Sequence, residues 1–217
     1  TAPAVQTPPP VTSSIADADG LAAFSYQWQR DGVAIAGATA STYTLGDADV
    51  GANIHVVVSY TDGNGTAENL TSAAVGPVAN VNDAPTGAPI VIGTATEDQT
   101  LSADTSTIAD SDGLGALSYQ WQRNGVNIGG ATGSTYLLGD ADVGTTVCVV
   151  VSYTDGNGSA ESLTSAAVGP VANVNDAPSG APVVTGTATE DQTLSADTST
   201  IADADGLGAF SYQWQRN

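Results

Sequence analysis

Acidic side chains stand in the segments between apolar runs, and they are the residues of this chain best suited to chemistry. Two examples are the pairs Glu97-Asp98 and Asp140/Asp142. Carboxylates that converge repel one another unless a cation lies among them. Ca²⁺, which takes roughly six to eight oxygen ligands, suits flexible acidic loops better than Mg²⁺ does. Whether these side chains can bind a cation depends on which turns the fold brings together.

The element that must organise those turns is a recurring strand. The sequence Ser-Tyr-Gln-Trp-Gln-Arg occurs three times, around Trp28, Trp121 and Trp214, which are the only tryptophans of the chain and lie 93 residues apart. Alternation puts Tyr and Trp on one face and Gln on the other, which is typical of a half-buried strand with an aromatic anchor. A fixed period of this length indicates a repeat architecture, with one small β-domain per repeat.

The repeat also sets the domain boundaries. Residues 94–124 and 187–217 differ at only two positions. We therefore expect a first repeat over 1–85 with a modified, proline-rich opening, a complete repeat over 86–178, and the first part of a third over 179–217. A sheet cut just after its Trp strand has an unpaired edge. We accordingly expect either a longer tandem array or completion of the ends by another chain.

The complete repeat contains short apolar runs separated by turn signals. The runs expected to form strands are 88–95, 100–108, 116–123, 126–128, 134–138, 145–154 and 159–171. Asn124-Gly125 is a dipeptide that favours a two-residue hairpin turn. This pattern, without a competing helical period, predicts an all-β fold with an antiparallel β-sandwich in each repeat of about 93 residues.

Comparison of the copies orients the long strand of each repeat. His55 in the first copy stands where Cys148 stands in the second, and a position that accepts both is expected to face outward. The residues then expected to face the core are Ile54, Val56, Val58, Tyr60 and their equivalents Val147, Val149, Val151 and Tyr153. Neither His55 nor Cys148 has the partners that a metal site or an activated nucleophile needs.

A Trp on the third strand, followed by the turn at 138–144 and a long strand, resembles an immunoglobulin-type domain. The usual disulfide pair is absent, and Asn53 or Thr146 occupies the tyrosine-corner position. With the further motifs, the chain is similar to the tandem immunoglobulin-like or cadherin-like repeats of giant bacterial surface and secreted adhesins. Those motifs are Asp-x-Asp-Gly, Asn-Val-Asn-Asp-Ala-Pro at 80–85 and 173–178, and Thr-Glu-Asp-Gln at 96–99 and 189–192.

In such a sandwich the turn after the first strand and the turn before the long strand lie at one end, and the loop before the Trp strand lies at the other. Head-to-tail stacking would bring these groups together, and the resemblance to cadherin-like junctions implies calcium among them. The candidate ligands of the second junction are Glu97, Asp98, Asp140, Asp142, Asn173, Asn175, Asp176, Asp203 and Asp205. Those of the first junction are Asp47, Asp49, Asn80, Asn82, Asp83, Asp110 and Asp112.

The first junction is expected to bind calcium more weakly. Ala4 and Val5 stand there in place of Glu97 and Asp98. An alternative interpretation covers both junctions, because Asp and Asn are ordinary turn formers and Asp-x-Asp-Gly is only a fragment of a calcium-loop motif.

The charge of the chain excludes several partners. The formal net charge is −20, with 23 acidic residues, three arginines and no lysine. A polyanion of this kind excludes nucleic acid and anionic membrane surfaces as partners. No stretch approaches the roughly 20 apolar residues of a membrane span. Cys148 is the single cysteine, so an intrachain disulfide is excluded. Arg123 is expected to pair with a nearby carboxylate or to lay its stem over apolar surface.

Two further turns carry asparagine. Asp62-Gly63-Asn64-Gly65 and the equivalent turn around Asn157 are expected to be hairpin turns. Asn64, Asn69 and Asn157 also stand in Asn-x-Ser/Thr glycosylation acceptors.

Together these features predict a structural and adhesive module, located outside the cell or at its surface, and not an enzyme. In this interpretation the partners are neighbouring repeats, and the array is a stalk or a component of a biofilm matrix. An alternative is a repeat subunit that self-assembles into an extracellular filament, which the outward Val57 and Val150 favour. A third hypothesis is a carbohydrate-binding accessory module, for which Tyr43 and Tyr136 are the candidate aromatic side chains.

Overall fold

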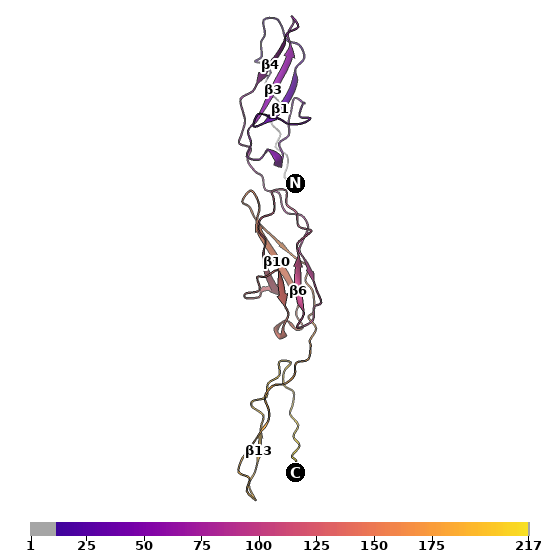
Figure 1. Cartoon of the computed structure of the whole chain (residues 1–217), viewed down its shortest axis with the longest axis vertical. Helices are drawn as coiled ribbons and strands as arrows, with labels where there is room; N and C mark the ends of the chain where they lie inside the picture. The colour runs from indigo at the N-terminus through magenta and orange to yellow at the C-terminus, as the bar shows by residue number, and fades with distance from the viewer. Residues whose placement is uncertain (1–11, 217) are drawn as a thin grey trace. The chain divides into compact units, whose positions relative to one another are not determined.

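The computed structural model of the chain describes residues 12–216, so the segment containing Ala4 and Val5 lies outside the described residues. The described residues form strands β1 to β13 and two short 3₁₀ turns, η1 and η2 (Figure 1). Their sheets are antiparallel, so the predicted all-β class is confirmed and the arrangement is consistent with a β-sandwich. The described residues contain no helix long and apolar enough to span a membrane.

The chain divides into two compact units. Of the described residues, the first comprises those up to 86, 109–116 and 153–161, and the second comprises 87–108, 117–152 and those from 162 onward. The division into three repeats stays a prediction.

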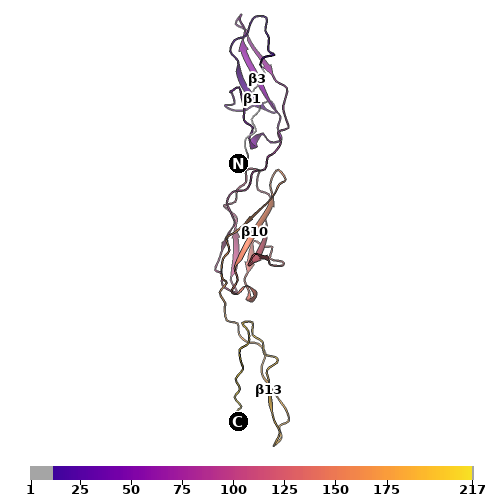
Figure 2. The same ribbon diagram turned by 180° about the vertical axis from the view of Figure 1, so that it is seen from behind.

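The first unit contains a four-stranded sheet with the order β2-β1-β3-β4. Its strands are β1 (Ser25–Arg30), β2 (Val33–Ala34), β3 (Ile54–Thr61) and β4 (Ala67–Thr71). Strands β1 and β3 lie side by side in both views (Figures 1 and 2), and Trp28 lies opposite Val56. This copy of the Trp-containing sequence therefore forms a central strand, as its alternation predicts, whereas the third copy, at 211–216, does not form a strand.

The core of this sheet lies on one face of β3. Ile54, Val56, Val58 and Tyr60 are buried, whereas His55 and Val57 between them are half-buried. The predicted orientation of the long strand is confirmed here. The indole Nε1 of Trp28 donates a hydrogen bond of 2.9 Å to the Ala40 carbonyl, which satisfies the one polar atom of the aromatic anchor.

The second repeat supplies two sheets, with the orders β5-β6-β9 and β11-β10-β7-β8. The strands are β5 (Ile90–Ile92), β6 (Thr100–Asp104), β7 (Ser118–Arg123), β8 (Val126–Asn127), β9 (Thr135–Leu137), β10 (Val147–Thr154) and β11 (Ala160–Thr164). The seven predicted strands are all present. The hairpin turn is also confirmed, because Asn124 and Gly125 have positive φ angles of 47° and 79° between the paired residues Arg123 and Val126.

Several strands are shorter than predicted, for local reasons. Strand β6 ends at Asp104, whose Oδ1 accepts a hydrogen bond of 2.9 Å from the Ser106 amide and so turns the chain. Strand β11 ends at Thr164, and beyond it Val168 and Val171 form only isolated bridges. Apolar runs extend past the strands because side chains outside the ladder also pack into the core.

The core of the second repeat gathers around Trp121, which is 0% exposed. The Trp121 ring is stacked on Tyr136 at a centroid distance of 5.7 Å, and its Nε1 donates to the Gly133 carbonyl at 2.9 Å. The other buried apolar residues in this repeat are Leu101, Ile108, Leu138, Val147, Val149, Val151, Tyr153 and Val171. Burial of such a side chain contributes about 1.5–3 kcal/mol.

The position of Cys148 is predicted to face outward, and the side chain is nearly buried there. Cys148 is only 9% exposed, although its neighbours Val147 and Val149 face the core and strand alternation puts it on the other side. The Gln122 side chain lies across the ladder from it, with 3.7 Å between Cys148 Sγ and Gln122 Oε1. A small side chain beside a long one is covered even on an outward face.

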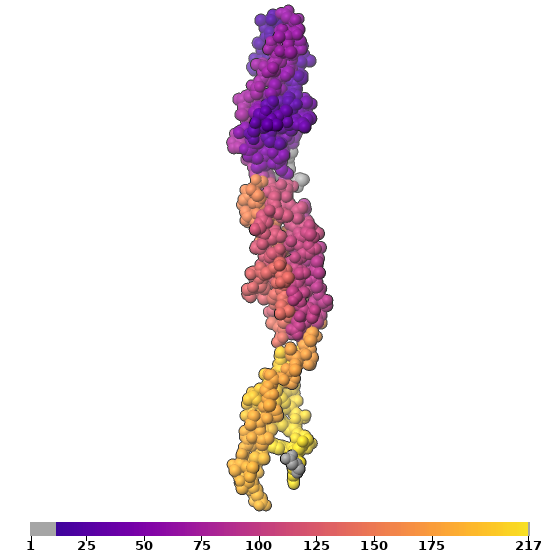
Figure 3. All heavy atoms as spheres, viewed as in Figure 1, coloured from indigo at the N-terminus to yellow at the C-terminus, as the bar shows by residue number. Residues whose placement is uncertain are grey.

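The last described segment forms the hairpin of β12 (Val183–Thr185) and β13 (Ser195–Asp197). The aromatic side chains that follow this hairpin in the chain are exposed, and Trp214 is 52% exposed. An open groove of about 310 Å³ lies between this hairpin and residues 210–214, and the opening is visible among the yellow spheres of Figure 3.

Candidate cation site

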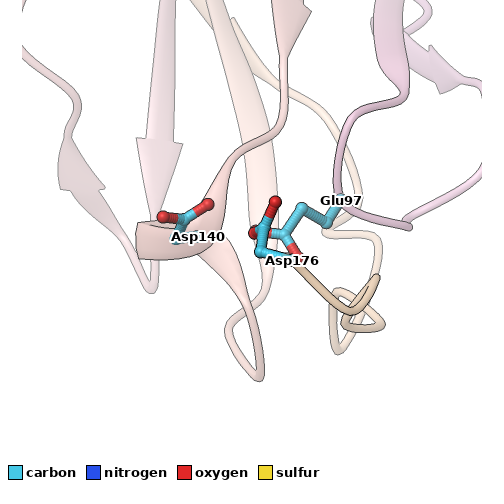
Figure 4. A group of neighbouring side chains, drawn as sticks. All are labelled: Glu97, Asp140 and Asp176. Carbon is cyan, nitrogen blue, oxygen red and sulfur yellow. The ribbon is translucent and has the colours of Figure 1, made fainter. Parts of the chain in front are cut away.

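Three carboxylates converge within the second unit. Glu97, Asp140 and Asp176 each offer one oxygen, and these oxygens lie within 4.8 Å of one another (Figure 4). Among the described residues this is the one group of three or more acidic, histidine or cysteine side chains close enough to share an ion. We call it the acidic triad.

Glu97 lies in the first turn of the repeat and is held in place by hydrogen bonds to the backbone of the linker. Its amide donates to the Ala172 carbonyl at 2.9 Å, and its Oε2 accepts from the Val174 amide at 3.0 Å. Glu97 is 1% exposed, and its other oxygen, Oε1, is buried without a hydrogen-bond partner among the described residues. A buried carboxylate oxygen without a partner is costly, so this oxygen is placed to accept a ligand from outside the protein.

The 3₁₀ turn η2 (Asp140–Asp142) presents the second carboxylate. Asp142 Oδ2 accepts the Gly139 amide at 3.0 Å, which fixes the turn from within. Asp140 is exposed and Asp142 is buried. The two aspartates of the Asp-Ala-Asp sequence therefore have separate roles, one facing the triad and one facing the interior.

The linker presents the third carboxylate. The Asp176 amide donates to Asp205 Oδ2 at 2.7 Å, and the Asp205 amide donates to Asp203 Oδ1 at 3.0 Å. The Asn175 side chain donates to the Asp176 carbonyl at 3.0 Å. Asp205 thus contributes to the site by holding the linker, a role that the sequence pattern did not predict.

The electrostatics of the triad disfavour full ionisation. The Val174 amide lowers the pKa of Glu97, but the close Asp140 carboxylate, burial and the charge of Asp176 outweigh it, so the pKa is raised. Burial also raises the pKa of Asp176, and the charges of Asp140, Asp205, Asp98 and Asp203 add to this effect. A divalent cation would offset these repulsions.

Asp142 and Asp49, two of the predicted cation ligands, form ion pairs with arginine. Arg123 Nη2 lies 2.7 Å from Asp142 Oδ1, and the Tyr136 hydroxyl donates to Asp142 Oδ2 at 2.9 Å. In the first repeat, Asp49 accepts in the same way from Arg30, at 2.6 Å. The expected pairing of Arg123 with a carboxylate is confirmed. Since these contacts engage both oxygens, the structure assigns Asp142 and Asp49 to the interior of their repeats.

The candidate residues of the first junction form hydrogen bonds around Asp112 instead of a triad. Asp112 Oδ2 accepts the Asp83 amide at 2.7 Å, and Oδ1 accepts the Asn157 side chain at 2.9 Å. The Asp83 amide is the main reason that the pKa of Asp112 is lowered; burial opposes it, and the Asn157 and Asn80 side chains reinforce it.

The remaining candidates are placed as follows. Asp110 Oδ2 accepts the Tyr153 hydroxyl at 2.6 Å, and the Asn82 side chain donates to Glu161 Oε1 at 2.8 Å. Asp98, Asp47 and Asn173 are exposed. Tyr153, Asn157 and Glu161 were not predicted at the junctions. For Asn157 the available signal was the repeated Asp-Gly-Asn-Gly turn, whereas nothing in the sequence marks Glu161.

A scan against models of protein families finds no match, and no curated protein matches the chain. The resemblance to adhesin repeats therefore stays a prediction drawn from motifs. Conclusions about function depend on the acidic triad and on the repetition of the chain.

Proposed function

We propose that this chain is a structural and adhesive module of an extracellular stalk or matrix, built from tandem immunoglobulin-like sandwiches and stiffened by calcium at a repeat junction. The observation that carries the proposal is the acidic triad, with the buried, unpartnered Oε1 of Glu97 at its centre. Neighbouring repeats are the partners in this function.

The topology of the second repeat supports the immunoglobulin-like assignment. Trp121 lies on β7, the third strand, and pairs across the ladder with Val149 on the long strand β10. The β5-β6-β9 sheet carries the fully buried Leu101. Seven short strands in two antiparallel sheets around a single tryptophan are typical of such sandwiches.

The repetition of contacts supports a role as a structural array. The linker amide bonds of Asp83 to Asp112 and of Asp176 to Asp205 both measure 2.7 Å. When each repeat contacts the next through the same linker contact, further repeats can be added without new interfaces, as in other repeat proteins.

The donor set of the triad supports a hard cation. Glu97, Asp140 and Asp176 offer oxygen alone, and no cationic side chain pairs with them among the described residues. Ca²⁺ prefers such oxygen ligands and tolerates irregular geometry, with carbonyls and waters completing its shell. A cation bound there would join the turn of Glu97, the turn η2 and the linker, and so would restrict the linker.

Thermal unfolding of the full chain in calcium and in chelator tests this step. A ligand that binds only the folded state stabilises it by about 2.7 kcal/mol at a concentration of ~100 times Kd. We expect calcium to raise the Tm of the wild type, and Glu97→Gln to abolish the shift. Asp47→Asn changes the residue equivalent to Asp140 in the first repeat and should keep the shift. Equal melting of the wild type in calcium and in chelator would remove calcium from the proposal.

The extracellular location has a separate test. Antibodies raised against the chain should label intact cells of the source organism, or the material between them, as strongly as permeabilised cells. Labelling that requires permeabilisation would contradict the stalk and matrix role while leaving the cation site unaffected.

A further inference from the structure

The chain contains the same asparagine-bearing turn twice, in two different settings. We propose that Asn64 is a site of spontaneous deamidation, and that Asn157 in the equivalent turn is protected by its hydrogen bond to Asp112. The proposal concerns a covalent modification, and it depends neither on calcium nor on an extracellular role.

The turn between β3 and β4 holds Asn64 through its backbone only. Asp62 Oδ1 accepts the amides of Asn64 and Thr66 at 2.9 and 2.7 Å. The Gly65 amide lies 3.2 Å from the Asp62 carbonyl, a long hydrogen bond. Asn64 is exposed, and its side chain makes no hydrogen bond among the described residues.

The turn between β10 and β11 has the same backbone arrangement. Asp155 Oδ1 accepts the amides of Asn157 and Ser159 at 2.9 and 2.8 Å, and the Gly158 amide lies 3.3 Å from the Asp155 carbonyl. Asn157 is also exposed. The two turns are therefore a matched pair, alike in sequence, backbone hydrogen bonds and exposure.

The side chain of Asn157 makes the difference. Its Nδ2 donates to Asp112 Oδ1 at 2.9 Å, and Asp112 is in turn buried and held by the Asp83 amide. The equivalent acid in the first repeat, Asp19, is exposed and makes no such bond with Asn64 among the described residues.

The reaction itself is an intramolecular displacement. The Gly65 amide nitrogen loses its proton and attacks Cγ of Asn64. The bond from Cγ to Nδ2 then breaks and ammonia departs, so that a cyclic succinimide remains. Water then opens the ring to aspartate or isoaspartate. Gly65 has no Cβ to obstruct the attack, and the exposed Asn64 side chain is free to rotate toward it.

Asn157 meets two barriers to the same reaction. Its carboxamide must first leave a charged acceptor, and a hydrogen bond to a charged group is among the stronger ones. The negative charge that develops on the carboxamide oxygen would also arise beside the Asp112 carboxyl group, which the Asp83 amide holds in place.

A third Asn-Gly sequence provides a comparison within the chain. Asn124 Oδ1 accepts from the amide and the hydroxyl of Thr146 at 3.0 and 3.2 Å, so this side chain is also held. Its equivalent is Asp31, whose Oδ1 accepts the Asn53 amide at 2.9 Å with a similar φ of 45°. An aspartate, which is the product of deamidation, is thus accommodated in the hairpin of Asn124. An aspartate in place of Asn157 would lie beside the Asp112 carboxylate.

Incubation of the folded chain at mildly alkaline pH, followed by peptide mapping with mass spectrometry, tests the proposal. We expect Asn64 to deamidate roughly ten-fold or more faster than Asn157, because the bond to Asp112 must break first. In denaturant the two sites should react at similar rates, since their sequences are alike. Equal rates in the folded chain would overturn the proposal, as would faster reaction at Asn124 than at Asn64.

A variant identifies the protecting residue. Asp112→Ala should raise the rate at Asn157 toward that at Asn64, whereas Asp19→Ala, the matched change in the first repeat, should leave both rates unchanged. An unchanged rate at Asn157 in folded Asp112→Ala would contradict the assigned role of Asp112. If that variant does not fold, the comparison of Asn64 with Asn157 in the wild type still decides.

Discussion

Arg123 and Asp142 form an ion pair of 2.7 Å in which the Asp142 side chain is only 1% exposed. The pair joins the end of β7 to the 3₁₀ turn that precedes β10. The Tyr136 hydroxyl donates to the same carboxylate, and the Tyr136 ring is stacked on Trp121. One acidic side chain therefore connects a turn, a strand and the aromatic anchor of the repeat.

Asp142→Asn should destabilise the chain by about 2–3 kcal/mol. Loss of one partner from a buried pair costs roughly 3–5 kcal/mol, and the expected loss is smaller here because Arg123 is partly exposed. Urea denaturation measures the effect through the unfolding midpoint. Asp140→Asn, two residues away but facing the triad, should cause no loss in chelator. Equal losses for the two variants would contradict the separate roles of these aspartates.

Trp121→Ala should cost about 3–5 kcal/mol, because it removes a fully buried aromatic side chain and leaves a cavity. The change Trp214→Ala is the matched control, since the surrounding sequence is the same but Trp214 is half exposed. It should cost far less in the same urea titration. A similar loss for both would show that Trp214 is buried in solution.

The pH dependence of stability in chelator should reveal Glu97. Because its pKa is raised in the folded state, the folded chain holds a proton that the unfolded chain has released. This stability is fully present below about pH 4.3, the ordinary pKa of glutamate. It is lost as pH rises through the folded-state pKa.

Glu97→Gln is the variant that measures this effect. Its stability should fall less between acidic and neutral pH than that of the wild type, and the difference between the two curves isolates Glu97 from carboxylates such as Asp112, whose pKa is lowered. Parallel curves would be inconsistent with the raised pKa.

Tyr153 should ionise only well above the ordinary tyrosine range. Burial raises its pKa most, followed by the hydrogen bond to Asp110. The folded state therefore keeps the phenol neutral while the unfolded state ionises near pH ~10, so stability from this group is lost as pH rises above that value. Ultraviolet absorbance of phenolate during alkaline titration should show a late step that Tyr153→Phe removes. Persistence of the step in that variant would assign it to another tyrosine.

The strands were predictable because they follow from local pattern. Alternation along β10 placed Val147 and Val149 in the core, and Asn124-Gly125 marked the hairpin. Strand ends were less predictable, since Asp104 ends β6 through a hydrogen bond to Ser106 that competes with the ladder. The burial of Cys148 was not predictable from alternation, because it depends on a neighbour across the sheet, Gln122.

The candidate site was predictable in part, for a reason visible in the Asp-Ala-Asp turn. Composition identifies both aspartates as turn residues, but only the geometry of the 3₁₀ turn sends Asp140 outward and Asp142 inward. Glu97 and Asp176 came from the expected convergence of turns and linker. No sequence pattern marks the amide contacts of Val174 and Asp176, because every residue except proline carries the same backbone donor.

The scarcity of basic residues has a consequence for digestion. Trypsin-like proteases cleave after Lys or Arg and require an extended, accessible backbone around that residue. Arg30 and Arg123 each end a paired strand and are held by buried carboxylates. Arg216 is exposed and stands outside the described strands. Among the described arginines, Arg216 is therefore the one most accessible to such enzymes.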